Sequence, residues 1–137
     1  MTMKFEEIEV GQSAEFTKSI SDEDVMSFAK ITGDFNSVHV DEVAASSSQF
    51  GGRIAHGMLT AGLISAALAG KLPGPGSVYL SQTLRFTAPV RIGDIVTATV
   101  QVIEIAAAKR RVKLSTVCTN QRGEKVIEGE ALVMVSI

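Results

Sequence analysis

The sequence predicts an α+β fold in which an antiparallel five-stranded sheet wraps around one buried central helix. Two observations carry this prediction. Residues 57–70 are almost entirely apolar, and apolar and polar residues alternate with a period of two from residue 78 onward. A helix that is apolar on every side must be covered by protein, whereas alternating segments form strands with one buried face. The strands therefore supply the cover that the helix needs.

The elements before the buried helix are shorter. Residues 14–19 are typical of a short strand, and Ser21 with Asp24 resembles a capping box at the start of a helix. Gly33 is the expected end of that helix. Its buried face would carry Val25, Phe28, Ala29 and Thr32. Residues 34–52 show no sustained periodicity, so we expect an ordered loop with one helical turn near residues 42–46.

The alternating pattern predicts four longer strands after the helix. These lie within residues 78–86, 96–102, 112–118 and 127–137, with hairpin turns near 106–109 and 121–123. A strand of ten residues reaches about 33 Å, whereas the 14-residue helix is about 21 Å long. The sheet can therefore curl around the helix, as in the hotdog fold.

Length and composition indicate one globular domain over residues 1–137, with 45% apolar and 20% charged residues. The net charge of −2 is spread along the chain, which argues against a nucleic-acid partner. The apolar segment is too short to span a membrane, for which about 20 residues are needed. Early acidic residues argue against a signal peptide. Cys118 is the only cysteine, so no intrachain disulfide or cysteine-based zinc site is possible, and we expect a cytoplasmic protein.

The densest group of residues able to carry proton chemistry lies in residues 32–39, Thr-Gly-Asp-Phe-Asn-Ser-Val-His. Asp34 and His39 can converge on one small volume and exchange protons with a bound water. From these residues alone an ordinary turn is the favoured interpretation, because Gly-Asp-x-Asn is a common turn composition.

A second candidate is Gly57, which begins the buried helix. The first N–H groups of a helix lack internal partners, and the helix dipole is positive there. A glycine at this point would let a carbonyl oxygen approach the backbone, as in an oxyanion hole. The alternative is that Gly57 only relieves crowding, and neighbouring His56 is expected to be structural rather than catalytic.

Three further polar groups receive simpler interpretations. The hydroxyls of Thr60 and Ser65 are expected to bond back to the preceding helical turn. Residues 109–111, Lys-Arg-Arg, are typical of a solvated hairpin, although they could meet the phosphates of a nucleotide-containing ligand. Cys118 is expected to be an inert core thiol.

Taken together, these segments resemble the MaoC-like hydratases, particularly the monofunctional (R)-specific enoyl-CoA hydratases. The motif reads Ile31-Thr32-Gly33-Asp34-Phe35-Asn36-Ser37-Val38-His39, with the small residue Ala45 six positions later. It departs from the family pattern only at Ser37, where proline is usual. The resemblance continues through residues 54–59, 72–80 and 86–94, and covers nearly the whole chain.

The resemblance implies a function and a set of site residues. The activity would be the reversible syn addition of water to a trans-2-enoyl-CoA, giving an (R)-3-hydroxyacyl-CoA, without metal or cofactor. Asp34 and His39 would be the catalytic pair, Gly57 would bind the thioester carbonyl, Asn36 would orient the pair, and Ser65 would lie close to Asp34. Such proteins are homodimers whose acyl tunnel lies near the subunit interface. The pathway stays open, and polyhydroxyalkanoate precursor supply is one candidate.

Three alternatives differ in chemistry. A 3-hydroxyacyl-carrier-protein dehydratase would run the same site in reverse on a protein-borne thioester. A hotdog thioesterase would attack the carbonyl carbon and release a thiol. A non-catalytic acyl-thioester-binding module would need no proton chemistry, and the presence of both Asp34 and His39 argues against it.

The helix pattern also predicts substrate length. The face that carries Ser65 also carries Ala61, Gly62, Leu68 and Ala69. Leu68 is the bulky member of this set, so we expect it to form part of the pocket floor. A floor there would favour short acyl chains of about four to six carbons.

Overall fold

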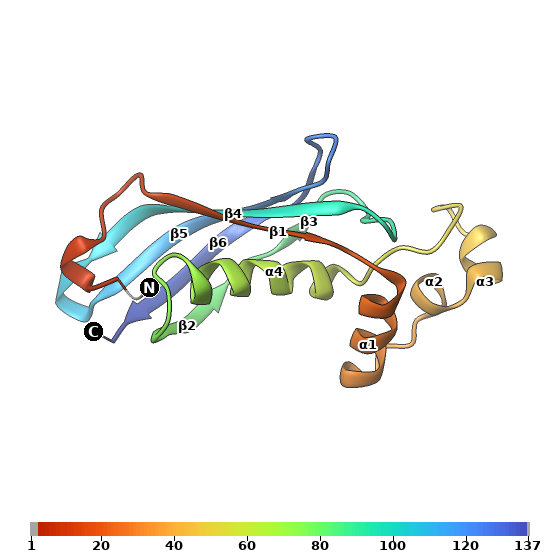
Figure 1. The fold of residues 1–137 in the computed structure, drawn as a ribbon, viewed down its shortest axis with the longest axis horizontal. Helices are drawn as coiled ribbons and strands as arrows, with labels where there is room; N and C mark the ends of the chain where they lie inside the picture. The colour runs from red at the N-terminus through yellow and green to blue at the C-terminus, as the bar shows by residue number, and fades with distance from the viewer. Residues whose placement is uncertain (1–2, 137) are drawn as a thin grey trace.

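A curled antiparallel sheet wraps one long central helix in the computed structural model, which describes residues 3–136 (Figure 1). The helix is α4 (Gly57–Gly70), and its bounds are those that the sequence predicts. The strands are β1 (Ser13–Ser19), β2 (Ser77–Gln82), β3 (Arg85–Phe86), β4 (Ile95–Ala106), β5 (Arg111–Thr119) and β6 (Lys125–Val135). Their order is β1-β4-β5-β6-β2, with β3 pairing to β6. This arrangement confirms the predicted hotdog fold.

The core lies between α4 and the concave face of the sheet. Leu63, Ile64, Ala67 and Leu68 of α4 are buried against the inward residues of the central strands. Along β5, buried and partly exposed residues alternate strictly from Arg111 to Thr119. The alternation of apolar and polar residues in the sequence therefore predicts correctly which face of the sheet covers the helix.

The predicted capping box begins α1 (Asp22–Thr32). Ser21 Oγ accepts a hydrogen bond from the Asp24 N–H, and the Asp24 carboxylate accepts one from the Ser21 N–H, both at 3.0 Å. The helix ends at Gly33, whose φ of 84° is a conformation that glycine adopts without strain. Of the predicted face, Val25 and Ala29 are buried, whereas Thr32 is exposed.

One part of the sheet differs from the prediction. Residues 78–86 were expected as a single strand, but they form β2 and β3, so the sheet has six strands in the described part of the chain. The pairing register of β2 shifts between Tyr79 and Ser81. Beyond it the Thr83 N–H donates to the Glu130 carbonyl at 2.9 Å. The backbone of Thr83 can approach β6 this closely because Gly129 has no Cβ. A Cβ at that position would collide with the Thr83 carbonyl oxygen.

The β2 strand also lacks the expected alternation of burial. Val78, Tyr79 and Leu80 are all at least 40% exposed. β2 lies at one end of the strand order, so one of its edges has no partner strand in the part of the chain that the structure describes. An exposed apolar edge strand is a surface that can pair with another chain.

The segment between α1 and α4 projects beyond one end of the sheet (Figure 1). It contains α2 (Ser37–Val40), which the sequence did not predict, and α3 (Glu42–Ser46), which matches the predicted helical turn. Asp41 separates them and accepts hydrogen bonds from the N–H groups of Val43 and Ala44. Short 3-10 turns occur at η1 (Phe5–Glu7) and η2 (Ala107–Lys109). Within residues 3–136, no helix is long and apolar enough to cross a membrane.

Candidate active site

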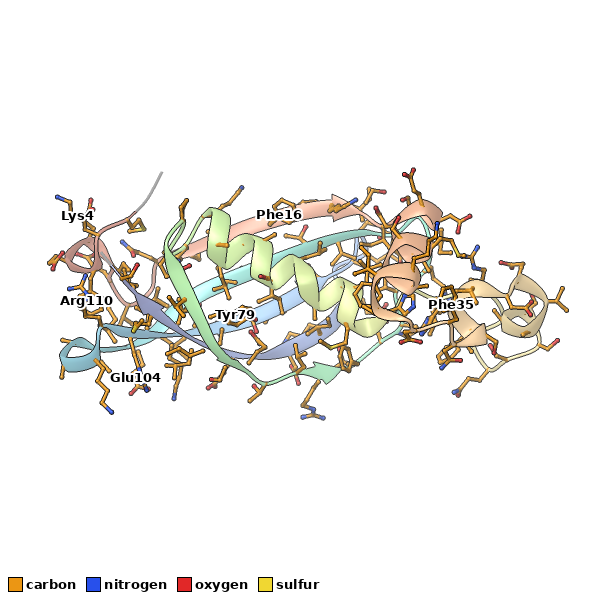
Figure 2. The ribbon with its side chains drawn as sticks, turned by 90° about the horizontal axis from the view of Figure 1, so that it is seen from below. Lys4, Phe16, Phe35, Tyr79, Glu104 and Arg110 are labelled. Carbon is orange, nitrogen blue, oxygen red and sulfur yellow. The ribbon has the colours of Figure 1, made fainter. Side chains whose placement is uncertain are left out.

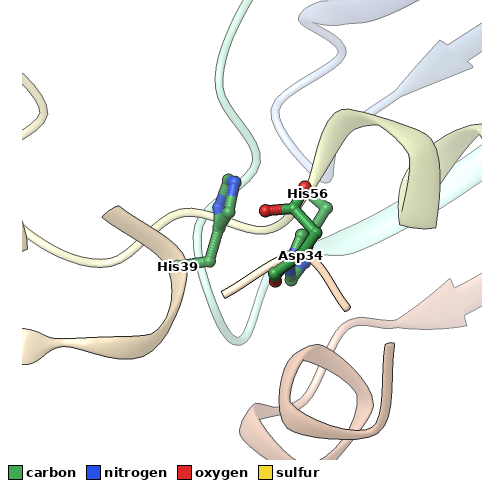
Figure 3. A group of neighbouring side chains, drawn as sticks. All are labelled: Asp34, His39 and His56. Atoms are coloured by element: carbon green, nitrogen blue, oxygen red, sulfur yellow. The ribbon is translucent and has the colours of Figure 1, made fainter. Parts of the chain in front are cut away.

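Asp34 and His39 meet at the end of the sheet from which this segment projects. Asp34 follows the left-handed Gly33, and His39 lies on α2 (Figure 3). An oxygen of the Asp34 carboxylate and ring nitrogens of His39 and His56 all lie within 4.8 Å of one another. The Asp34 residue is exposed, whereas His39 is only 9% exposed. The structure thus places the two predicted catalytic side chains side by side.

The protonation of the His39 ring follows from its hydrogen bond. Nδ1 of His39 lies 2.8 Å from the Ile54 carbonyl oxygen. A carbonyl oxygen can only accept, so Nδ1 carries the proton and Nε2 of the neutral ring has a free lone pair. The backbone of His39 is held as well, because Nε of Arg53 donates to its carbonyl at 2.6 Å. His39 is therefore arranged to accept a proton at Nε2.

The Asp34 carboxylate is oriented by the backbone of its own loop. Its Oδ1 accepts a hydrogen bond from the Asn36 N–H at 3.1 Å, and the Asp34 N–H donates to Thr32 Oγ1 at 3.2 Å. Asn36 was expected to orient the catalytic pair, and it contacts Asp34 through its main chain. The Asn36 residue is exposed and is the N-cap of α2, without a side-chain capping bond.

A cleft of about 450 Å³ opens beside this pair. Asp34 and His39 line it together with the first turn of α4 and the segment that follows β3. The lining includes Phe50, His56, Gly57, Met58, Thr60, Phe86 and Pro89. The wall is mostly apolar, as in ligand sites where a few polar groups fix the orientation of the ligand.

Gly57 places backbone donors at this cleft. Leu59 and Thr60 donate their N–H groups to the His56 carbonyl, whereas the N–H groups of Gly57 and Met58 precede the first possible intrahelical bond. The positive end of the α4 dipole lies at the same point. A Cβ on Gly57 would come within 2.6 Å of the Phe86 ring. The glycine thus leaves room for the Phe86 ring in its observed position and keeps the backbone accessible.

The three neighbouring groups Asp34, His39 and His56 could also be considered as metal ligands. The two imidazole rings are stacked, with centroids 4.0 Å apart and planes inclined by 29°. Lone pairs in nearly parallel rings do not converge on one ion, as tetrahedral or octahedral ligation requires. Nδ1 of His39 and Nε2 of His56 are bound to carbonyl oxygens, so each ring has only its other nitrogen available. The stacking of the two rings argues against one ion shared by both histidines.

Ser65 and Leu68 lie elsewhere along α4. Neither lines the cleft that contains Asp34. Ser65 lines a second cavity of about 480 Å³ with Met58, and a third of about 170 Å³ with Leu68. Ser65 is eight residues beyond Gly57, which corresponds to about 12 Å along the helix axis. Within the described part of one chain, Ser65 and Asp34 therefore line different cavities.

Tyr79 and Gln82, which line the second cavity, belong to a chain of polar side chains. The Tyr79 hydroxyl donates to Oε1 of Gln82, whose Nε2 donates to the buried Thr116 hydroxyl at 2.8 Å. Burial raises the pKa of Tyr79, so its hydroxyl stays protonated and acts as a donor. Burial also raises the pKa of Cys118 to about 12, in agreement with the predicted inert core thiol.

Some residues of the cleft had no role in the sequence interpretation. Phe86 reaches the cleft only because β3 pairs with β6, which local patterns do not reveal. The basic residues 109–111, by contrast, are far from it. Figure 2 shows Arg110 at the opposite end of the molecule from Phe35. Arg110 lies over the Phe5 ring and near Glu6.

Comparison with known proteins agrees with this fold and site. Residues 4–125 match the MaoC like domain. A 3-hydroxybutyryl-CoA dehydratase of Methylorubrum extorquens is 54% identical over 96% of this chain and 83% of its own length. An (R)-specific enoyl-CoA hydratase of Rhodospirillum rubrum is 53% identical over 96% of this chain and 90% of its own.

A solved structure shares the whole architecture. The unliganded R-hydratase PhaJ1 from Pseudomonas aeruginosa superposes with a TM-score of 0.93 at 49% identity, covering 98% of this chain and 86% of that one. These similarities extend over the loop that carries Asp34, the central helix and the sheet. The chain therefore belongs to the MaoC-like domain family and has its hotdog fold.

Proposed function

We propose that this protein is an (R)-specific enoyl-CoA hydratase, a hydro-lyase that adds water reversibly to trans-2-enoyl-CoA. One observation carries the proposal: Asp34 and His39 lie within 4.8 Å of each other beside the N-terminus of α4. A single water hydrogen-bonded to both groups at about 2.8 Å can span that separation. The (R) configuration is supported by the name of the Rhodospirillum rubrum relative.

The chemistry follows from the positions of these groups. The water oxygen attacks C3 of the enoyl thioester while one of its protons passes to the Asp34–His39 pair. The pair returns a proton to C2, so that the water is added across the double bond with atoms and charge balanced. Negative charge develops meanwhile on the thioester oxygen, and the Gly57 N–H at the positive end of α4 stabilises it. Because both groups come from one side, the addition is syn.

This reaction needs neither metal nor redox cofactor, since no electrons are transferred and the acid, base and oxyanion donor are all protein groups. CoA is carried by the substrate. The CoA thioester is preferred over a carrier-protein thioester because both relatives named above act, by their names, on CoA substrates. A cytoplasmic location, where acyl-CoA thioesters are formed and consumed, is part of the same proposal.

The protein is further proposed to be a homodimer that pairs through β2. The apolar side chains of Val78, Tyr79 and Leu80 are exposed on a strand that ends the sheet order. The second cavity opens onto the same strand. A partner chain would cover both and would bring a second α4, with its Ser65, towards the first. Sedimentation or light scattering would show a monomer if this proposal were wrong.

Short acyl chains of about four to six carbons are the proposed substrates. The name of the Methylorubrum extorquens relative refers to a four-carbon acyl group. Leu68 is 2% exposed and lines the cavity of about 170 Å³ together with Ser65 and Tyr79. Gly57 and Leu68 are about 16 Å apart along one helix. Leu68 can thus limit the length of the acyl chain only if the reacting carbons lie near Ser65 of the partner subunit.

The direct test supplies crotonyl-CoA and follows the loss of the enoyl absorbance, with chiral analysis of the product. The proposal expects (R)-3-hydroxybutyryl-CoA and no free thiol. Release of thiol without hydration would instead indicate a thioesterase. A parallel assay would use the crotonyl thioester of a carrier protein. Much faster turnover of that substrate than of crotonyl-CoA would assign the protein to the dehydratases of protein-borne substrates.

A further inference from the structure

His56 lies at the junction of three elements around the candidate site. It is the N-cap of α4 and is only 2% exposed. One side of its ring lies against Phe28 of α1, with centroids 4.7 Å apart. On another, the ring stacks on His39 of α2 at 4.0 Å. The His56 ring thus joins the catalytic loop to the helix that begins at Gly57.

The hydrogen bond of His56 defines its tautomer. Nε2 lies 2.9 Å from the backbone carbonyl oxygen of Asp34, which can only accept, so Nε2 carries the proton. Nδ1 is then an unprotonated acceptor, and it is buried without a hydrogen-bond partner among residues 3–136. The two stacked rings therefore have opposite tautomers, with the proton on Nδ1 in His39 and on Nε2 in His56.

A phenylalanine would fill this space without burying an unpaired nitrogen, which is energetically costly. The presence of histidine rather than phenylalanine at position 56 is explained if the Nε2–H is needed as a hydrogen-bond donor to Asp34. Asp34 is an exposed loop residue, and its backbone carbonyl accepts the hydrogen bond from that N–H, while the ring of His56 stacks on His39. With one side chain, His56 contacts both members of the catalytic pair.

We infer that His56 is a positioning residue, which holds Asp34 and His39 at the separation that one water can bridge. We assign no proton transfer to His56, because its N–H is bound to the Asp34 backbone and its Nδ1 is buried. This inference rests on the proposed function for its kinetic part. Its structural part, the opposite tautomers, is independent of the activity.

The structural part can be tested directly because the chain contains only two histidines. ¹⁵N NMR of histidine-labelled protein is expected to show two neutral rings, one protonated on Nδ1 and the other on Nε2. In His56→Phe the Nδ1–H ring is expected to remain, which assigns it to His39. A His56 ring protonated on Nδ1 would overturn the inference, even if the protein had no hydratase activity.

The kinetic test separates the hydrogen bond from packing. His56→Phe keeps a ring but loses the donor, and we expect kcat for crotonyl-CoA to fall at least tenfold with KM changed less than threefold. Phe28→Leu is the matched control. It removes packing on His56 without touching the hydrogen bond, so it should lower the melting temperature but leave kcat within about twofold.

Equal losses of kcat in these two variants, or normal kcat in His56→Phe, would overturn the inference. If His56→Phe does not fold, His56→Gln and His56→Asn provide the comparison. Both side chains are amides, but only glutamine is long enough to place its nitrogen near the position of Nε2. The inference requires the glutamine variant to have at least tenfold higher kcat than the asparagine variant, and equal values would contradict it.

Discussion

Nδ1 of His39 donates a hydrogen bond to the carbonyl oxygen of Ile54, two residues before His56 and three before Gly57. This contact fixes the tautomer of His39 and ties α2 to the backbone that leads into α4. Nε2 of the neutral His39 ring is thereby left as an acceptor. The catalytic base and the oxyanion donor are consequently positioned by the same short segment.

The first prediction concerns this pair. Asp34→Asn and His39→Gln should each lower kcat for crotonyl-CoA by about 10²–10⁴-fold, because each removes one of two groups that handle the same water. The double variant should be little worse than either single variant, since residues that act as a unit are not additive. Steady-state kinetics on protein of normal circular dichroism would measure this. A single variant with near-normal turnover would contradict the mechanism.

The second prediction concerns the break between β2 and β3. Gly129→Ala places a Cβ against the Thr83 carbonyl oxygen, which is backbone and cannot move aside cheaply. We expect the free energy of unfolding to fall by at least about 2 kcal/mol. Gly70→Ala is the control, because a Cβ at Gly70 meets nothing within 4 Å. That variant should be neutral or slightly stabilised. Urea denaturation that finds both variants alike would refute this account of Gly129.

The third prediction concerns the departure from the family motif at Ser37. Ser37 is the first residue of α2, a position where the missing N–H of proline is tolerated. Asn36 before it has φ −53° and ψ 131°, which is compatible with a following proline. Ser37→Pro should therefore raise the free energy of unfolding by about 0.4–1 kcal/mol, since it restricts the unfolded chain. A lower melting temperature would show that the Ser37 N–H has a role.

The fourth prediction concerns pH. The hydrogen bond from Lys18, and then that from the Ser21 backbone, lower the pKa of Asp24 below its ordinary value of 3.8. The ionised carboxylate therefore stabilises the folded state above about pH 4, and this contribution is lost as the pH falls through the lowered pKa. Asp24→Asn should cost up to about 1 kcal/mol at neutral pH. Denaturation curves of both proteins should converge in acid, and a difference independent of pH would exclude the carboxylate charge as the cause.

Local signals predicted much of this structure. The bounds of α4 and α3, the capping box at Ser21 and the end of α1 at Gly33 all follow from residues adjacent in sequence. The division of residues 78–86 into two strands did not, because it depends on Gly129, more than 40 positions away. The position of His56 between α1 and α2 is likewise a tertiary contact, which no periodicity encodes.

Only part of the candidate site could be predicted from the sequence, because some of its contacts are local and others are tertiary. Asp34 and His39 are five residues apart in one loop, so their proximity was accessible from the sequence. Ser65 was placed near Asp34 by the family resemblance alone. The rise of α4 separates Ser65 from Gly57 by about 12 Å. Because Ser65 does not line the cleft that contains Asp34, we expect any proximity to Asp34 to involve a second subunit. Substrate length is therefore a test of the assembly.

The last prediction uses Leu68 for that test. Leu68→Ala enlarges the cavity that it shares with Ser65, Tyr79 and Val133. If the reacting carbons lie beside Ser65 of the partner subunit, the extra space accommodates a longer acyl tail. Each buried methylene contributes about 0.8 kcal/mol, so two further carbons should raise kcat/KM for octenoyl-CoA relative to crotonyl-CoA about tenfold. If Leu68 is only a core residue, the variant loses about 2–5 kcal/mol of stability and the ratio stays constant. Measuring both substrates on the same preparation makes the ratio independent of the folded fraction. An unchanged ratio would place the acyl tail away from Leu68 and contradict the proposed short-chain floor.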